Sequence, residues 1–127
     1  MKGYREVEIT EGGRGASVSV AGAATECVGK GYIRDNQDAG RIRVRVAISA
    51  VSLGGGSLAG TLYHGPSADD AVVSTGKTIN VTATGDYYFL VNESDTSLVP
   101  LMPYLEIRVA STGAATCTVS KCGLFKA

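Results

Sequence analysis

The sequence predicts an all-β protein: a two-sheet antiparallel sandwich of the jelly-roll type, with about eight strands and an extended N-terminal segment. Three observations predict this fold. Several short segments alternate apolar and polar residues, which is the period of a half-buried strand. Turn-forming residues separate these segments at intervals of roughly eight to twelve residues. The 17 glycines among 127 residues are nearly double the average share, and they suit tight turns better than helices.

The strongest strand signal begins at Arg41, where apolar residues alternate with Arg41, Arg43 and Arg45. This alternation predicts a buried face and a basic outer face. Tyr104–Val109 and Glu6–Ile9 repeat the pattern with charged residues outward, and such stripes can pair across strands. Nowhere do apolar residues recur at helical spacing over three turns, so a single helical turn at 67–73 is the most helix we expect. The predicted strands are Glu6–Ile9, Ala16–Ala21, Thr25–Gly29, Arg41–Ile48, Leu58–His64, Lys77–Ala83, Asp86–Val91, Tyr104–Val109 and Ala115–Phe125.

The chain has the length of one domain, and that length is sufficient for a real core. We expect residues 1–14 to form an N-terminal arm or first strand and residues 15–127 to form the jelly-roll domain. Twelve basic residues balance twelve acidic ones, whereas a nucleic-acid binder usually carries a basic excess. The sequence shows neither an apolar signal segment nor a membrane span. We therefore expect neither nucleic acid nor membrane as a partner.

Three cysteines, Cys27, Cys117 and Cys122, are an odd number, which argues against a complete disulfide framework. On one regular strand Cys117 and Cys122 would lie roughly 16 Å apart and face opposite sides, too far apart to be bridged. Buried, reduced thiols in a protein made in a cytosol are the prediction.

No catalytic, metal-binding or cofactor-binding residues are predicted. The one histidine, His64, falls on the strand face of Leu58 and Leu62, which favours a packed side chain. Ser57 or Ser67 with His64 and Asp69 would make a formal triad, but nothing marks a strained nucleophile turn or an oxyanion hole. The histidine and cysteines lack zinc spacing. Gly54–Gly56 precedes a strand rather than the helix that a dinucleotide motif requires.

Leu98–Pro103 is an apolar, proline-broken run that follows a polar segment. Two interpretations stay open: a buried crossing between the sheets, or an exposed loop that contacts another protein.

A series of short landmarks occurs in order along the chain: Cys27-Val28-Gly29, Arg34-Asp35, Gly40 before Arg41–Ile48, Gly54–Ser57, Leu58–His64, Ser67–Asp70, Tyr104–Val109 and Gly113–Phe125. In this order the landmarks resemble the capsid cement (decoration) proteins of tailed phages, specifically the small jelly-roll kind on the capsids of short-tailed phages. The resemblance covers about Val18 to Phe125. In that group an arginine often flanks each side of the late Tyr-Leu pair, whereas this chain has Pro103 and Glu106 there, and 92–97 resembles an insertion.

The resemblance implies a non-enzymatic virion protein, made in the host cytoplasm, that binds the outer surface of the assembled head. It implies the major capsid protein as partner, joined at neighbouring subunits, and self-association as a homotrimer or a dimer. The contacts implied for this chain are Tyr4, Arg5, Arg14, Arg34, Asp35, Asp38, Arg41, Arg43, Arg45, Leu98, Leu101 and Met102. For the three strand arginines, a solvated outer sheet face is the alternative interpretation and the one that we favour.

Two other classes of function remain. A carbohydrate-binding or receptor-binding β-sandwich module of a phage tail would use the same architecture, with ligands bound through loops and tyrosines. An enzyme is the third class, and the single histidine and missing metal ligands argue against it.

Overall fold

The computed structural model describes residues 6–13, 15–32, 41–69, 72–92 and 103–126, and these form nine strands in two antiparallel sheets. Within these ranges no helix is present, so the described part of the chain offers no helix that could cross a membrane. The strands are β1 (Glu6–Glu8), β2 (Val18–Val20), β3 (Thr25–Tyr32), β4 (Arg41–Ser52), β5 (Ser57–Gly65), β6 (Val73–Asn80), β7 (Gly85–Asn92), β8 (Tyr104–Thr112) and β9 (Thr116–Lys126).

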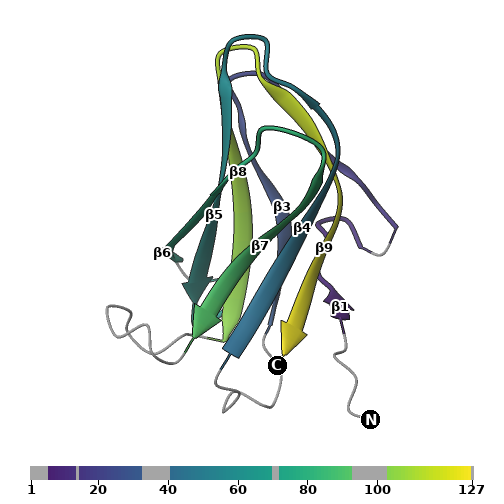
Figure 1. Ribbon diagram of the computed structural model, residues 1–127. Helices are drawn as coiled ribbons and strands as arrows, with labels where there is room; N and C mark the ends of the chain where they lie inside the picture. The colour runs from purple at the N-terminus through teal and green to yellow at the C-terminus, as the bar shows by residue number, and fades with distance from the viewer. Residues whose placement is uncertain (1–5, 14, 33–40, 70–71, 93–102, 127) are drawn as a thin grey trace.

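The strand order is that of a jelly roll, as the alternation and turn spacing predict. Sheet A has the order β1-β9-β4-β7, with β2 also pairing with β9, and sheet B has the order β3-β8-β5-β6. Most connections pass from one sheet to the other, so strands adjacent in the sequence are rarely neighbours in a sheet. The two sheets lie face to face, and β1 lies beside the end of β9 (Figure 1).

The core consists of the side chains that alternate inward from both sheets. Val44 and Val46 of β4 are completely buried, and so are Leu105, Ile107 and Val109 of β8. The predicted inward faces of these two strands are therefore confirmed. Because the two inner faces interdigitate, most of the apolar surface is removed from water at once, which is the main stabilising term of a sandwich.

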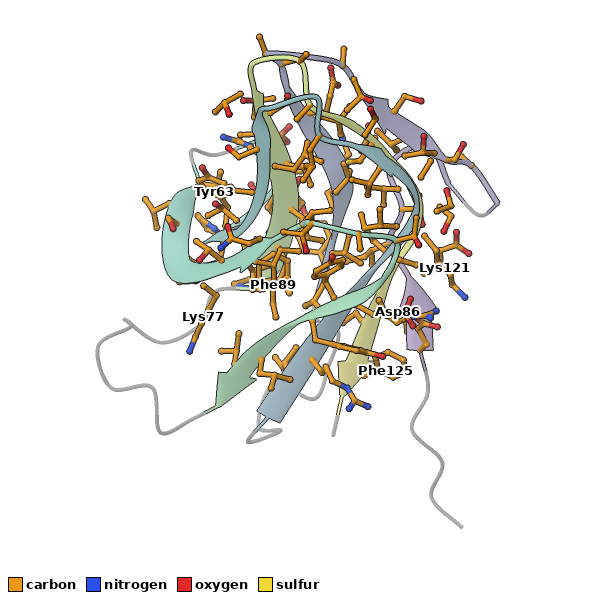
Figure 2. All side chains as sticks on the ribbon, turned by 45° about the horizontal axis from the view of Figure 1, so that its top comes forward. Tyr63, Lys77, Asp86, Phe89, Lys121 and Phe125 are labelled. Atoms are coloured by element: carbon orange, nitrogen blue, oxygen red, sulfur yellow. The ribbon has the colours of Figure 1, made fainter. Side chains whose placement is uncertain are left out.

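Tyr87, Tyr88 and Phe89 of β7 alternate as a strand requires. Phe89 is 2% exposed and lies between the sheets (Figure 2). Tyr88, the next residue along the strand towards its start, is 41% exposed on the outer face. The Tyr87 hydroxyl accepts hydrogen bonds from Thr82 N and Ala83 N and donates one to Ala83 O. It thereby holds the turn that carries the chain from β6 to β7.

The prediction that Cys117 and Cys122 face opposite sides is wrong. Both thiols are buried on the inner side of β9. Lys121 pairs with Ala47 while Val119 pairs with Ile48, so Ser120 is an extra residue on β9. A bulge of this kind shifts the alternation by one residue, which returns Cys117 to the inner face. The thiols are free, as predicted.

After β1 the chain crosses from sheet A to sheet B and closes one side of the sandwich. Ile9 N donates to Cys122 O of β9, and Lys30 N of β3 donates to Ile9 O, each at 2.8 Å. At this point Gly29 lies directly against Cys122. A Cβ on residue 29 would lie only 2.8 Å from the Cys122 Cβ. The glycine therefore permits the close approach of β3 to β9.

Other differences from the prediction are local. The sixth strand lies at 73–80 rather than 77–83, and β3, β4 and β8 run three to four residues longer than predicted. No helical turn is present among the described residues of 67–73, where Ala68 and Asp69 form a turn instead. Leu98–Met102 lies outside the described residues, as do residues 1–5 and 14 of the predicted arm. The division at residues 14 and 15 stays a prediction.

Candidate functional site

The outer face of sheet A carries the most distinctive surface of the described chain. Its outward side chains come from four strands that are far apart in the sequence, and they separate into an ionic part and an aromatic part. The ionic part consists of Glu6, Arg45, Asp86 and Lys121. The aromatic part consists of Arg43, Tyr88, Leu90 and Phe125. Figure 2 shows Asp86, Lys121 and Phe125 on this side of the molecule.

In the ionic part, Glu6 lies between two cations. Arg45 Nε and Nη2 donate to the two Glu6 carboxylate oxygens at 2.9 Å each, a bidentate pair, while Lys121 Nζ lies 3.3 Å from Glu6 Oε1. Arg45 Nη1 also reaches Asp86 at 3.3 Å. The hydrogen bonds that Arg45 donates to Glu6 raise the pKa of Arg45. Two positive and two negative charges cancel, so this part of the face presents little net charge.

The Glu6–Arg45 pair spans a strand, because β9 lies between β1 and β4. Glu6 faces Phe125 and Arg45 faces Gly123 in their ladders with β9. A Cβ on residue 123 would collide with the Glu6 carboxylate. Because Gly123 has no side chain, Glu6 of β1 can reach over β9 to Arg45 of β4. The predicted pairing of acidic and basic stripes therefore occurs across an intervening strand.

In the aromatic part, Arg43 stacks on two rings. Its guanidinium carbon lies 5.3 Å from the Tyr88 ring centroid and 5.0 Å from the Phe125 ring centroid, both within cation–π distance. Leu90, the ladder partner of Arg43 on β7, is 52% exposed. Tyr88 and Leu90 are exposed and Phe125 is partly buried, so apolar surface surrounds one cation. We call Arg43, Tyr88, Leu90 and Phe125 the Arg43 patch.

The outer face of sheet B differs from that of sheet A, because its arginine Arg108 is already paired with a carboxylate. Arg108 lies over the Tyr63 ring at 4.5 Å and donates to Glu106 at 2.6 Å. The Tyr104 hydroxyl donates to the same carboxylate at 3.0 Å, and burial raises the pKa of Tyr104. Tyr32 packs at a tilt on Tyr104 with a centroid distance of 5.2 Å.

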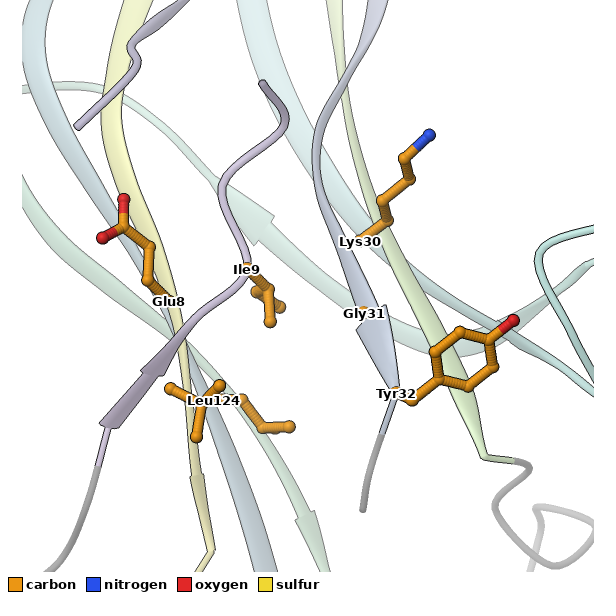
Figure 3. A pocket seen from close by; sticks show the side chains of 7 residues that line it. Glu8, Ile9, Lys30, Gly31, Tyr32 and Leu124 are labelled. Atoms are coloured by element: carbon orange, nitrogen blue, oxygen red, sulfur yellow. The ribbon is translucent and has the colours of Figure 1, made fainter. Parts of the chain in front are cut away.

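A pocket of about 310 Å³ opens between β1 and β3, where the two sheets diverge. Its apolar lining includes Val7, Ile9 and Leu124. Figure 3 shows Ile9 and Leu124 on one side and Gly31 of β3 on the other. The Glu8 carboxylate is engaged by the Thr10 hydroxyl and by Gly15 N. No convergent set of polar groups enters the pocket from these residues, so it offers apolar contact rather than chemistry. Its lining residues are Val7, Glu8, Ile9, Lys30, Gly31, Tyr32 and Leu124.

His64 is 1% exposed, as predicted from its strand face, and a ring buried to that extent is not accessible to a substrate in solution. The Ser57 hydroxyl is hydrogen-bonded to the Thr112 hydroxyl at 2.7 Å. Among the described residues, no three histidine, cysteine, aspartate or glutamate side chains lie close enough to hold a metal ion.

Of the predicted contact residues, the structure describes the side chains of Arg43 and Arg45 and only the backbone of Arg41. Arg45 is engaged within the protein, whereas Arg43 belongs to the exposed patch, so the basic stripe is not one functional unit. The roles of all the predicted contacts stay predictions. The remaining predicted contacts, Tyr4, Arg5, Arg14, Arg34, Asp35, Asp38, Leu98, Leu101 and Met102, lie outside the described residues.

Sequence reasoning missed three members of the Arg43 patch. Tyr88 and Leu90 alternate with the buried Phe89 and Val91, so the period of two in 86–91 was the signal for an outward apolar pair. Phe125 had no such signal, because its proximity to Arg43 depends on the register between β4 and β9.

No protein-family model and no curated protein matches the sequence. Among solved structures, the VP2 subviral particle of infectious bursal disease virus is similar with a TM-score of 0.54 and 9% identity, over 96% of this chain and 32% of that one. A structure of the Gt strain of the same virus has a TM-score of 0.52 and 11% identity, over 96% and 32%. A carbohydrate-binding module specific for non-crystalline cellulose, CBM28, has a TM-score of 0.49 and 15% identity, over 98% and 80%.

The chain spans about a third of the length of the viral chains that it matches. At identities this low the likeness concerns the fold alone. This chain is a jelly-roll β-sandwich, an architecture that it shares with a domain-sized part of a viral particle protein.

Proposed function

We propose that the protein is a capsid decoration, or cement, protein of a tailed phage. It binds the outer surface of the assembled head without catalysing a reaction, and it joins neighbouring major capsid subunits. The protein assembles as a homotrimer or a dimer, and it is made in the host cytoplasm. Shell stabilisation needs only binding: a subunit that binds the assembled lattice and not the dissociated one stabilises the lattice by mass action.

The observation that carries this proposal is the Arg43 patch. Arginine and aromatic residues are enriched where protein interfaces are energetically strongest, and here they are exposed on a regular sheet face. Tyr88 and Leu90 are 41% and 52% exposed, which leaves apolar surface for a partner to cover. The landmark motifs that resemble phage cement proteins, and a fold shared with a viral particle protein, agree with this role.

The test is to mix the purified protein with heads of the encoding phage that were assembled without it. We expect saturable binding at a fixed number of copies per capsid subunit, together with a higher disruption temperature of the heads. A Tyr88→Ser, Leu90→Ser double variant should bind more weakly, because both side chains are on the outer face. Tyr63→Ser, on the outer face of the other sheet, is the matched control and should bind as the wild type does. If the wild-type protein leaves the heads unchanged, the proposal is wrong.

Carbohydrate binding by a tail module is the second candidate, and one observation favours it. The Tyr32 ring is 46% exposed and is supported from behind by Tyr104, which makes a small stacking platform. A glycan array distinguishes this function from the cement role. Carbohydrate binding is favoured if the protein binds a defined glycan, if Tyr32→Ala abolishes that binding, and if the protein does not bind heads.

A further inference from the structure

Arg43 lies beside two aromatic rings that come from different strands. Its guanidinium carbon is 5.3 Å from the Tyr88 ring centroid and 5.0 Å from the Phe125 ring centroid. In the ladders of sheet A, Arg43 is directly opposite Phe125 on one side and Leu90 on the other. The rings therefore come from both neighbouring strands, and they restrict the side chain before any partner arrives.

Among the described residues, no carboxylate forms an ion pair with Arg43, whereas the two described cations on the same sheet face, Arg45 and Lys121, are both paired. Arg45 forms ion pairs with Glu6 and Asp86, and Lys121 forms one with Glu6. Arg108 makes the contrast clear: it also stacks on a tyrosine, at 4.5 Å, but its Nε already donates to Glu106 at 2.6 Å. Arg43 has the stacking contacts of Arg108 without the carboxylate.

We propose that Arg43 is the anchor for a carboxylate on a partner protein, and that this partner is an acidic side chain with an apolar neighbour. A guanidinium group presents N–H donors in a planar fork that matches the two oxygens of a carboxylate. The Tyr88 and Phe125 rings pack against the side chain, and no carboxylate among the described residues occupies its N–H donors. Exposed Tyr88 and Leu90 then contact the apolar group beside the carboxylate. The naming of the major capsid subunit as that partner rests on the proposed function; the carboxylate anchor itself does not.

The surroundings favour a protein over a nucleic acid or a sugar. A nucleic acid requires many unpaired cations along its phosphates, whereas the charges of Glu6, Arg45, Asp86 and Lys121 cancel next to Arg43. The patch lies on a regular strand face rather than in the 310 Å³ pocket, and protein partners are the ligands that cover open surfaces of this composition.

The anchor is tested first without any capsid, by nuclear magnetic resonance of the whole protein labelled at its arginines. The probe is N-acetyl-phenylalanine, which joins one carboxylate to one apolar group, and its uncharged amide is the control ligand. We expect a saturable shift of the Arg43 Nε–H resonance with the acid and not with the amide. Arg108 serves as the internal control and should not shift. Arg43→Lys should bind the acid at least about tenfold more weakly.

Three results would overturn the carboxylate anchor: equal shifts with acid and amide, equal shifts at Arg43 and Arg108, or no saturable shift at Arg43. Saturable binding of glucuronate at Arg43 without binding of N-acetyl-phenylalanine would overturn the assignment to a protein partner.

The second test uses heads and separates the anchor from the proposed function. Arg43→Lys should lose affinity for heads by at least about tenfold, whereas Arg108→Lys should bind as the wild type does. Carbodiimide coupling of the Arg43→Lys variant on heads should join Lys at position 43 to an aspartate or glutamate of the major capsid subunit. If the wild type binds heads and Arg43→Lys binds equally well, the anchor is wrong and the cement role stands. If the probe titrates Arg43 but the wild type does not bind heads, the anchor stands and the cement role is wrong.

Discussion

His64 lies in β5 with its side chain 1% exposed, inside the sandwich. Burial lowers its pKa below the ordinary value of 6.5, because the charged form loses its hydration. The neutral form is therefore the one that the folded protein favours. The unfolded chain binds a proton as the pH falls through about 6.5, while the folded protein resists protonation.

Above about pH 6.5, we therefore expect His64 to cause no change of the free energy of unfolding with pH. Below about pH 6.5, the free energy of unfolding should fall as the pH drops towards the lower pKa of His64 in the folded protein. The slope approaches at most about 1.4 kcal/mol per pH unit in that window. Urea unfolding of the wild type and of His64→Gln between pH 7.5 and 5.5 measures it. The variant should show a flatter dependence, and parallel curves for the two proteins would contradict this assignment.

Cys27 is half-buried on the outer side of β3, and its surroundings disfavour the thiolate form. Burial, followed by the charges of Glu106 and Glu11, raises its pKa to about 11. Cys122 is completely buried, and burial raises its pKa to about 12. Since only the thiolate reacts, partial exposure of Cys27 does not confer reactivity.

At pH 8, iodoacetamide should modify Cys27 roughly a hundredfold more slowly than a free cysteine, because the thiolate fraction is lower by about that factor. The rate should rise about tenfold per pH unit up to pH 10. Mass spectrometry of the labelled peptides locates the modification, and Cys27→Ser supplies the background. If Cys27 is labelled at pH 8 as fast as free cysteine, then the pKa of its thiol is not raised.

Among the elements, β1 is as short as β2 and has little support of its own. It contains three residues and pairs only with β9 within sheet A. Further contacts hold it there, among them the Glu6–Arg45 pair across β9 and the crossing of Ile9 to β3. The first of these contacts depends on the missing side chain at Gly123.

Gly123→Ala should expel the Glu6 carboxylate and break its two hydrogen bonds to Arg45. We expect a loss of about 1–2 kcal/mol of unfolding free energy, the range for charge-assisted hydrogen bonds at a partly exposed site. Amide exchange at residues 6–8 should become faster, while exchange in β8 stays unchanged. Denaturant unfolding and hydrogen exchange measure the two effects.

The control is a double-mutant cycle with Glu6→Gln. Both single variants remove the same contact, so the double variant should lose hardly more stability than either one. Fully additive losses would mean that Gly123 acts on something other than the Glu6–Arg45 pair.

At the scale of the whole molecule, the first described strand pairs with the last one, and most connections cross between the sheets. Neither sheet can bury its inner face without the other. The described domain therefore has one core, to which strands from both ends of the chain contribute.

We expect a single cooperative unfolding transition and slow refolding, in milliseconds to seconds, because pairing of distant segments requires the closure of long loops first. Tyrosine fluorescence and far-ultraviolet circular dichroism should give coincident denaturation curves. Stopped-flow refolding measures the rate. Microsecond refolding, or two separate transitions, would show that the sheets form independently.

Local sequence determined which side chains of a strand share a face. Alternation in β4 and β8 placed Val44, Val46 and Ile107 inside, and turn residues marked where strands end, because both signals depend on backbone geometry over a few residues. The same alternation placed Arg43 outside. The alternation in β7 likewise predicts that Tyr88 points outward. It does not predict that Tyr88 lies next to Arg43, because the two residues are on different strands.

Register and strand neighbours were decided only in the tertiary structure, because they depend on contacts between segments far apart in the chain. The extra residue Ser120 moved Cys117 to the inner face. The placement of β9 between β1 and β4 gave Arg45 its partner, Glu6, across Gly123. That same packing left Arg43 among rings from two other strands. Two arginines of one sequence pattern thus differ in role because of what the fold brought beside each of them.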